Sequence, residues 1–262
     1  MTEARILTLD LETSPILGLV WGLRDQNLST EQIVEDWSVL CYCAKWMDSD
    51  KILSGHTGGR GKGWVRDDRR ILRELWELLD EADAVVAQNG KRFDMKMIDG
   101  RMVQHGMKPY SPVKVIDTLL ASRDRFRFPT HKLAYQSRVL TDTPKSDHRK
   151  FPGWELWTEV LADNPAAWKE MLAYCEIDVR ATEKVYLKQR PWIRRHPNLG
   201  VYAEDKNIRC VGCASDRLQS RGYETTHQGR FPRYQCQACG KWNRGKMQQL
   251  ATNVRKNLLV GL

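Results

Sequence analysis

The sequence lacks any apolar run long enough to cross a membrane, since no stretch approaches the roughly 20 apolar residues that a transmembrane helix needs. Its first residues, Met-Thr-Glu-Ala-Arg, also lack the apolar segment of a secretory signal. No internal repeat or low-complexity tract is present, which argues against a solenoid or a wholly disordered chain. We therefore expect a soluble, cytoplasmic, globular protein that binds no membrane.

Acidic side chains are scarce in the last 75 residues, where 15 Lys and Arg stand against 4 Asp and Glu. The preceding residues are nearly neutral, with 27 Lys and Arg against 29 Asp and Glu, so the net charge of +9 belongs to the C-terminal part. This asymmetry indicates a polyanionic partner for the basic part, most simply nucleic acid. A basic end that is merely well solvated is the alternative.

Four of the seven cysteines form two C-x-x-C pairs within this basic region, Cys210 with Cys213 and Cys236 with Cys239. A hairpin that brings the pairs together would offer four thiolates to one structural Zn²⁺, at metal–sulfur distances of about 2.3 Å. Two redox dithiols are the alternative, but the polar and glycine-containing stretch between the pairs does not resemble a thioredoxin-like unit. A module this short buries little apolar surface, so we expect it to depend on the metal to fold.

The first 190 residues alternate between short apolar runs and amphipathic segments. Strands are predicted at residues 6–11, 38–47, 85–87 and 113–116, and helices at 65–79 and 93–103. Asn164-Pro165 is a typical helix start, and it opens a long helix that Pro191 ends. Helix–strand alternation after an opening set of strands predicts a mixed α/β sheet with helices packed on it.

Acidic side chains interrupt three of these apolar patterns. Asp10 and Glu12 share one face of the first strand, because alternate residues of a strand point the same way. Asp94 lies in the first turn of a helix on its inward side, and Asp178 lies in an apolar stripe of the long helix, one turn after Tyr174. Like charges in such surroundings repel one another and need compensation, for which a divalent cation is the economical answer.

Leu7-Thr8-Leu9-Asp10-Leu11-Glu12-Thr13, Asn89-x-x-x-Phe93-Asp94 and Tyr174-x-x-x-Asp178 together resemble the three motifs of the DnaQ-like, or DEDD, superfamily of 3′→5′ exonucleases. The tyrosine is typical of the DEDDy branch, whereas the histidine branch would carry His where Ala173 stands. The resemblance covers residues 5–190 and implies an RNase H-like fold. The two-part design with a ribbon also resembles stand-alone nucleases of bacteriophages, which would place the protein in the host cytoplasm.

The resemblance implies a metal-dependent 3′→5′ exonuclease that releases 5′-mononucleotides from nucleic acid, with DNA favoured. Asp10, Glu12, Asp94 and Asp178 would hold two Mg²⁺ or Mn²⁺ ions about 4 Å apart, with Asp10 bridging them. Tyr174 would orient the attacking water. The expected partner is nucleic acid with a free 3′ end, single-stranded DNA by preference, and replication proteins could assist. Oligomeric state is not specified by the sequence.

Two alternatives stay open. The first is a catalytically silent nucleic-acid-binding protein for replication or repair, against which the retained acids argue, since binding alone gives no reason to keep four mutually repelling carboxylates. The second is an RNase D-like exoribonuclease with the same chemistry. The sequence contains nothing that reads a 2′-hydroxyl.

The domain prediction is an exonuclease domain at residues 1–190, a linker at 191–205, and a zinc ribbon with a basic C-terminal segment at 206–262. The ribbon is expected to bind phosphates through its basic side chains, with one tryptophan as a stacking candidate. A protein-docking role is the alternative for the ribbon. The predicted nucleic-acid contacts are Arg217, Arg221, Arg230, Arg233, Lys241, Trp242 and Arg244.

Overall fold

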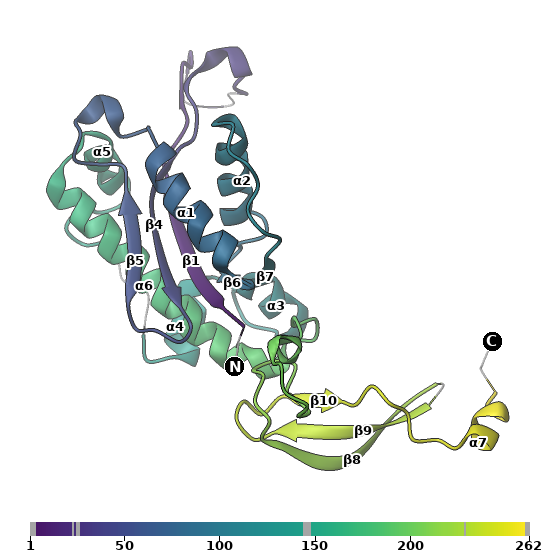
Figure 1. Cartoon of the computed structure of the whole chain (residues 1–262). Coiled ribbons are helices and arrows are strands. Elements are labelled where there is room, and N and C mark those ends of the chain that lie inside the picture. Colours follow the sequence, from purple (N-terminus) through teal and green to yellow (C-terminus); the bar gives the residue numbers. More distant parts are fainter. Residues whose placement is uncertain (1–3, 23, 25–26, 144–147, 228, 260–262) are drawn as a thin grey trace. The chain divides into compact units, whose positions relative to one another are not determined.

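The computed structural model describes residues 4–22, 24, 27–143, 148–227 and 229–259. They divide into two compact units, one formed by Arg5–Tyr186 and the other containing Leu187–Leu262. Figure 1 shows the elements of both units along the chain. Within the described residues, no helix is both long enough and apolar enough to span a membrane.

A five-stranded mixed sheet with the order β5-β4-β1-β6-β7 is the centre of the first unit. Strand β1 pairs antiparallel with β4 and parallel with β6, so it is the middle strand at which the sheet changes direction. The predicted strands and the mixed sheet are confirmed. The strands are β1 (Ile6–Thr13), β4 (Val39–Trp46), β5 (Ile52–His56), β6 (Ala84–Ala87) and β7 (Lys114–Asp117).

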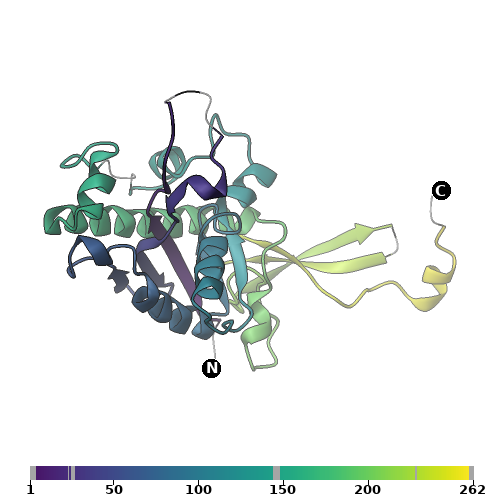
Figure 2. The same cartoon turned by 90° about the horizontal axis from the view of Figure 1, so that it is seen from above.

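Helices cover both faces of this sheet. On one face α1 (Arg69–Glu81) and α2 (Asp94–Gln104) pack on Leu7, Leu9 and Leu11 of β1. On the other face the 25-residue α6 (Pro165–Gln189) packs on β4. Figure 2 shows the sheet between these two helical layers. The remaining helices of this unit are α3 (Thr118–Arg125), α4 (Leu133–Leu140) and α5 (Glu155–Leu161), with 3-10 turns at Thr30–Gln32 and Lys62–Trp64.

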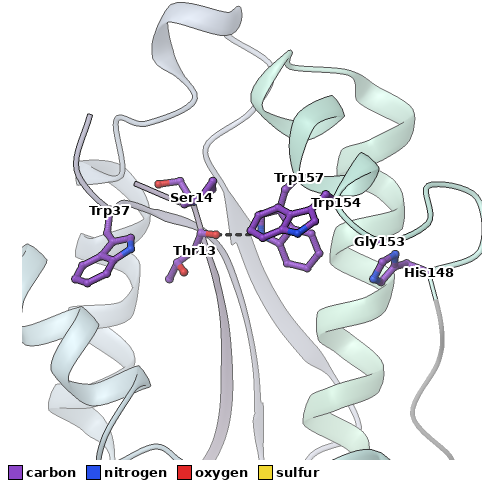
Figure 3. A pocket seen from close by; sticks show the side chains of 8 residues that line it. Thr13, Ser14, Trp37, His148, Gly153, Trp154 and Trp157 are labelled. Carbon is purple, nitrogen blue, oxygen red and sulfur yellow. Dashed lines mark hydrogen bonds between the residues drawn. The ribbon is translucent and has the colours of Figure 1, made fainter. Parts of the chain in front are cut away.

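A short hairpin of β2 (Leu17–Gly18) and β3 (Ile33–Glu35) follows β1. Its strands are too short for a clear alternation of apolar and polar residues, which is why the sequence does not predict them. The chain returns from β3 into β4 through Asp36, Trp37 and Ser38. This return segment lies next to the end of β1 (Figure 3), where the Ser14 N–H donates to the Ser38 carbonyl.

The second unit is built on a three-stranded antiparallel sheet with the order β10-β9-β8. Two 3-10 turns precede it, and Leu199 of the second turn is buried, with 2% exposure. The Leu199 N–H donates to the Val211 carbonyl at 2.9 Å. The elements are the turns Arg190–Trp192 and Leu199–Tyr202, the strands β8 (Leu218–Thr226), β9 (Gly229–Cys236) and β10 (Trp242–Arg244), and the helix α7 (Thr252–Lys256).

Candidate active site and zinc ribbon

Asp10 and Glu12 project from β1 toward the face that α6 covers. In the antiparallel register Asp10 lies opposite Cys43 and Glu12 opposite Cys41, and directly paired residues share a face of a sheet. Both cysteines belong to the core cluster beneath α6. The Cys175 thiol of α6 donates to the Asp10 carbonyl oxygen at 3.5 Å, which ties the helix to this point of the strand.

Asp178 reaches the same point from α6. One carboxylate oxygen from each of Asp10, Glu12 and Asp178 lies within 4.8 Å of the other two. Asp178 is only 4% exposed, and the two β1 acids are half-buried. Three acids this close in low-dielectric surroundings repel one another strongly unless a cation or protons compensate them.

Asp94, at the start of α2, is not a member of that triad but lies beside it. It is 2% exposed, and its carboxylate accepts from the backbone N–H of Leu11, the residue between the two β1 acids. Burial raises the pKa of Asp94 to about 7, and the charge of Asp117 adds to the rise, while hydrogen bonds from its own N–H and that of Leu11 oppose it.

Asp117 at the end of β7 holds the turn that precedes Asp94. Its carboxylate accepts from the N–H groups of Asn89 at 3.2 Å, Lys91 at 3.1 Å and Leu120 at 3.0 Å. Asn89 has a φ of 66°, the left-handed conformation that asparagine tolerates better than most residues. A helix cap and hydrogen bonds to the preceding turn therefore account for the Asp117 carboxylate.

Tyr174 lies one helical turn before Asp178 on α6, half-buried. The ring of His148 meets it edge-on, with ring centroids 5.2 Å apart and planes at 79°. His148 Nδ1 is 2.8 Å from the Phe151 carbonyl oxygen, which can only accept, so this nitrogen carries the proton. The sequence left His148 open between the periphery of the active site and a plain loop, because an isolated histidine in a polar stretch gives no signal of its surroundings.

The donor set at this centre fits a hard divalent cation. All four acids offer only oxygen ligands. Mg²⁺ and Mn²⁺ prefer oxygen, whereas Zn²⁺ also binds nitrogen and sulfur. A bound cation would also remove the cost of placing three carboxylates within 4.8 Å of one another.

Cys210, Cys213, Cys236 and Cys239 offer four sulfur atoms that all lie within 4.8 Å of one another. The Sγ atoms of Cys210 and Cys239 are 3.7 Å apart, and those of Cys213 and Cys236 are 3.6 Å apart. A tetrahedron with Zn–S bonds of about 2.3 Å has edges of about 3.8 Å. The cluster therefore has the spacing of a four-cysteine zinc site, and all four residues are free cysteines.

Each cysteine pair is shaped by a tight turn. The Ala214 N–H donates to the Cys210 carbonyl and the Gly240 N–H to the Cys236 carbonyl, both at 2.9 Å. Ala214 and Gly240 both have a positive φ, of 56° and 79°. Hydrogen bonds from the thiols of Cys213 and Cys239 hold the pKa of Cys210 well below its usual range, so a thiolate, the form that binds metal, is favoured there.

One face of the ribbon carries alternating arginines and aromatic rings. Arg233 lies opposite Arg244 and Gln235 opposite Trp242, so these side chains share a face. The guanidinium carbon of Arg233 is 4.9 Å from the ring centroid of Trp242, which is 47% exposed. Arg221 also stacks over Trp242 at 5.9 Å, and Arg244 over Phe231 at 4.7 Å. We call this set of side chains the arginine–aromatic face.

Three predicted contacts lie elsewhere in this unit. Arg217 is exposed just before β8, and Arg230 stacks on Tyr223 at 4.7 Å on the opposite face of the sheet. Lys241 is 6% exposed, and its ammonium donates to the carbonyl oxygens of Ile193 at 2.6 Å and Arg190 at 3.4 Å. That side chain holds the ribbon to the preceding turn, so its charge is already used within the protein.

The glycine-rich stretch at residues 58–63 binds a carboxylate of the protein itself. The Gly59 and Gly61 N–H groups donate to the two oxygens of Asp163 at 2.8 and 2.7 Å, and Trp168 Nε1 donates to one of them at 2.8 Å. A side chain at Gly58 would come within 2.0 Å of Trp168 Nε1, so glycine is required there. The N–H groups of Gly59 and Gly61 are thus already hydrogen-bonded within the protein.

Residues 61–189 match the family model described as the RNase H superfamily. Among solved structures, the chain is similar to a family B DNA polymerase from the hyperthermophilic archaeon Pyrobaculum calidifontis, with a TM-score of 0.52 and 18% identity. The similarity covers 76% of this chain and 25% of the polymerase, so the chain spans about a quarter of the polymerase's length. No curated protein sequence matches the chain.

The sheet order and the family match together define the class of the protein. It contains an RNase H-like α/β domain, which confirms the predicted fold. A four-cysteine cluster consistent with a zinc ribbon accompanies that domain.

Proposed function

We propose that the protein is a metal-dependent 3′→5′ exonuclease that hydrolyses phosphodiester bonds of DNA and releases 5′-mononucleotides. The observation that carries the proposal is the convergence of Asp10, Glu12 and Asp178 within 4.8 Å, from a strand and a helix far apart in sequence. The RNase H-like fold supports a nuclease, because the acids lie on the central strand and on the helix packed across it.

The proposed mechanism assigns each acid a part. Asp10, Glu12 and Asp178 would hold the first ion, and Asp10 with Asp94 the second. Bound Mg²⁺ or Mn²⁺ would lower the pKa of the attacking water and stabilise charge on the leaving 3′-oxygen. Tyr174, held by its place on α6 and by the edge of His148, would donate or accept one hydrogen bond to orient that water. Its phenol need not ionise.

The ribbon is proposed as a nucleic-acid-binding module that folds around one structural Zn²⁺. Its arginine–aromatic face combines guanidinium groups, which bind phosphates, with rings on which bases stack. Lys241 is left out of this proposal because its ammonium is committed to two backbone carbonyls. An exoribonuclease is the second candidate, since the same acids and the same face would serve equally for RNA.

Digestion of end-labelled oligonucleotides tests the proposal. With Mg²⁺ or Mn²⁺, single-stranded DNA labelled at the 5′ end should shorten one nucleotide at a time, and DNA labelled at the 3′ end should release labelled mononucleotide at once. Parallel RNA and duplex substrates decide the preferred nucleic acid. A protein that binds these oligomers but leaves all of them whole with manganese supplied would be the catalytically silent alternative.

A further inference from the structure

The arginine–aromatic face of the ribbon presents guanidinium groups rather than bare rings. Arg221 and Arg233 lie over the ring of Trp242, and Arg244 lies over the ring of Phe231. A base that stacks on a protein ring needs an open ring face, and here arginines of the protein already lie over both rings. Phosphate oxygens bind instead at the N–H edges of a guanidinium group, which stacking on a ring leaves open.

Two hydrogen bonds to the backbone fix the guanidinium group of Arg233. Its Nε and one of its terminal nitrogens donate to the Arg221 carbonyl oxygen, at 3.2 and 3.0 Å. That carbonyl lies at an irregularity of β8, where the register with β9 shifts and Gly222 has a φ of 75°. A bulge of this kind turns a backbone group out of the regular ladder. A base that stacks on the Arg233 side of Trp242 would therefore have to displace a side chain that the backbone holds.

The three arginines lie close together without a compensating acid. Arg233 and Arg244 are directly opposite each other on β9 and β10, and neighbouring strands are about 4.8 Å apart. In the part of the chain that the structure describes, Arg221, Arg233 and Arg244 form no ion pair. Like charges that are directly opposite in a sheet destabilise it. A polyanion bound across these side chains would relieve that repulsion.

One acid shares this face of the sheet. Glu224 of β8 is exposed and lies directly opposite Phe231. It is the single acidic residue in the sequences of β8, β9 and β10. Its carboxylate would repel a phosphate that lies on the neighbouring arginines, so its removal provides a test in which binding should become stronger.

Double-stranded DNA matches a compact group of cations better than a single strand does. A duplex carries one phosphate charge per about 1.7 Å of helix axis, against about 3.4 Å for one strand. The same three arginines therefore meet about twice the charge on a duplex. The bases of a duplex are already paired and stacked on one another, so they need no ring of the protein.

We infer that the arginine–aromatic face binds the phosphate backbone of double-stranded DNA. Trp242 and Phe231 are then supports that hold the arginines in place, not stacking sites for bases. The inference rests on the nucleic-acid-binding role that the proposed function gives the ribbon, and it names the class of substrate. The exonuclease would act on a free 3′ end that belongs to a duplex.

Fluorescence anisotropy tests the inference with the full-length, zinc-loaded protein and no added Mg²⁺ or Mn²⁺, so that nothing is cleaved. We expect a blunt duplex to bind at least about tenfold more tightly than either of its strands at the same salt concentration. Arg233→Ala should weaken duplex binding about tenfold, the effect of one charge-assisted hydrogen bond. The matched control is Arg230→Ala, since Arg230 lies over the ring of Tyr223 on the opposite face of the same sheet. This control should stay within about twofold of the parent.

Abasic oligomers distinguish phosphate binding from base stacking. A single strand without bases keeps its phosphates, so Arg233→Ala and Trp242→Ala should each lose the same factor in affinity with this ligand as with a normal strand. A loss that is confined to strands with bases would mean that Trp242 stacks on bases, and it would overturn the inference. Equal duplex affinity of Arg233→Ala and Arg230→Ala would overturn it as well.

Glu224→Gln gives a result that a misfolded ribbon cannot produce. We expect this variant to bind the duplex about two- to fivefold more tightly than the parent, because one exposed negative charge is removed from the path of the phosphates. Unchanged or weaker binding would mean that the DNA backbone does not lie on this face.

Digestion of the labelled oligonucleotides separates this inference from the proposed nuclease activity. If the parent shortens DNA but Arg233→Ala binds the duplex as the parent does, only the inference about the face falls. If the parent binds the duplex through this face but cleaves no oligonucleotide with Mn²⁺, the exonuclease proposal falls and the duplex-binding face stands.

Discussion

At the scale of single residues, the acidic triad follows from two simple periodicities. Alternation along β1 places Asp10 and Glu12 on one face, and the spacing of three to four residues along α6 places Asp178 on the side that packs on the sheet. Sequence reasoning reaches these residues because a charge within an apolar pattern is visible without coordinates. The sequence does not show that the carboxylates of Asp10, Glu12 and Asp178 meet at one point; only the folded structure does.

Asp178→Asn tests the triad against a neighbour on the same helix. Glu176 lies two residues away and pairs with Arg180 on the surface, so Glu176→Gln is the matched control. We expect Asp178→Asn to lower cleavage with Mn²⁺ by at least about 100-fold, because a ligand oxygen is replaced by an amide in a cluster built to hold a cation. Glu176→Gln should stay within about twofold. Single-turnover cleavage measures both, and equal activity of the two variants would contradict the assignment.

Lys241 marks what sequence reasoning at the residue scale could not reach. Lys241 lies in a basic stretch and reads as a phosphate contact, but burial commits its charge to carbonyl oxygens. The outcome for Lys241 depends on carbonyl oxygens that come from more than 40 residues away in the sequence.

Salt dependence separates the two roles of positive charge in the ribbon. Replacing Arg233 and Arg244 by Ala should lower the slope of log affinity against log salt by about 0.7 for each arginine on single-stranded DNA. Lys241→Ala should leave that slope unchanged and instead lower the stability of the ribbon by about 1.5–3 kcal/mol, the cost of charged hydrogen bonds lost from a buried position. If Lys241→Ala also reduces the slope of log affinity against log salt, Lys241 does contact a phosphate.

At the scale of elements, a buried carboxylate fixes the start of β4. Asp68, at 0% exposure, accepts from the Val39 N–H at 2.9 Å and from Arg101 at 2.7 and 2.9 Å. His105 Nε2 is 2.7 Å from its other oxygen. One side chain thus joins the beginnings of β4 and α1 to α2.

Neighbouring aspartates give a matched test of this link. Asp68→Ala leaves the half-buried Arg101 without its partner and removes the buried carboxylate that joins β4 to α2, which should cost about 3–5 kcal/mol of unfolding free energy. Asp67→Ala removes ion pairs with Arg60 and Arg69, both largely exposed, and should cost less than about 1 kcal/mol. Urea unfolding measures the difference. Similar losses for the two variants would mean that the Asp68 network does not stabilise this region.

At the scale of the whole molecule, the mixed sheet and the ribbon were predictable for different reasons. Strong apolar runs predicted β1, β4, β6 and β7, and cysteine spacing alone predicted the metal cluster, because few arrangements of two C-x-x-C pairs have another use. The β2–β3 hairpin was not predictable, since strands of two or three residues leave no periodicity.

The two compact units should respond differently to loss of zinc. Outside the cluster the ribbon has little buried apolar surface, and every residue of β8 except the half-buried Leu218 is exposed. We expect Cys239→Ser, or removal of zinc with a chelator, to abolish amide protection in β8–β10 while β1 and β6 stay protected. Hydrogen exchange with and without restored Zn²⁺ measures this. A ribbon that keeps its protection without metal would contradict a folding role for the cluster.

Anomalous scattering from crystals soaked in Mn²⁺ tests the central claim most directly. The account predicts manganese at the oxygens of Asp10, Glu12 and Asp178, with a second ion between Asp10 and Asp94 when a nucleotide is bound. It also predicts that Asp178→Asn crystals lose the first peak and Glu176→Gln crystals keep it. Crystals of the active protein with manganese bound elsewhere and none at these carboxylates would contradict the account.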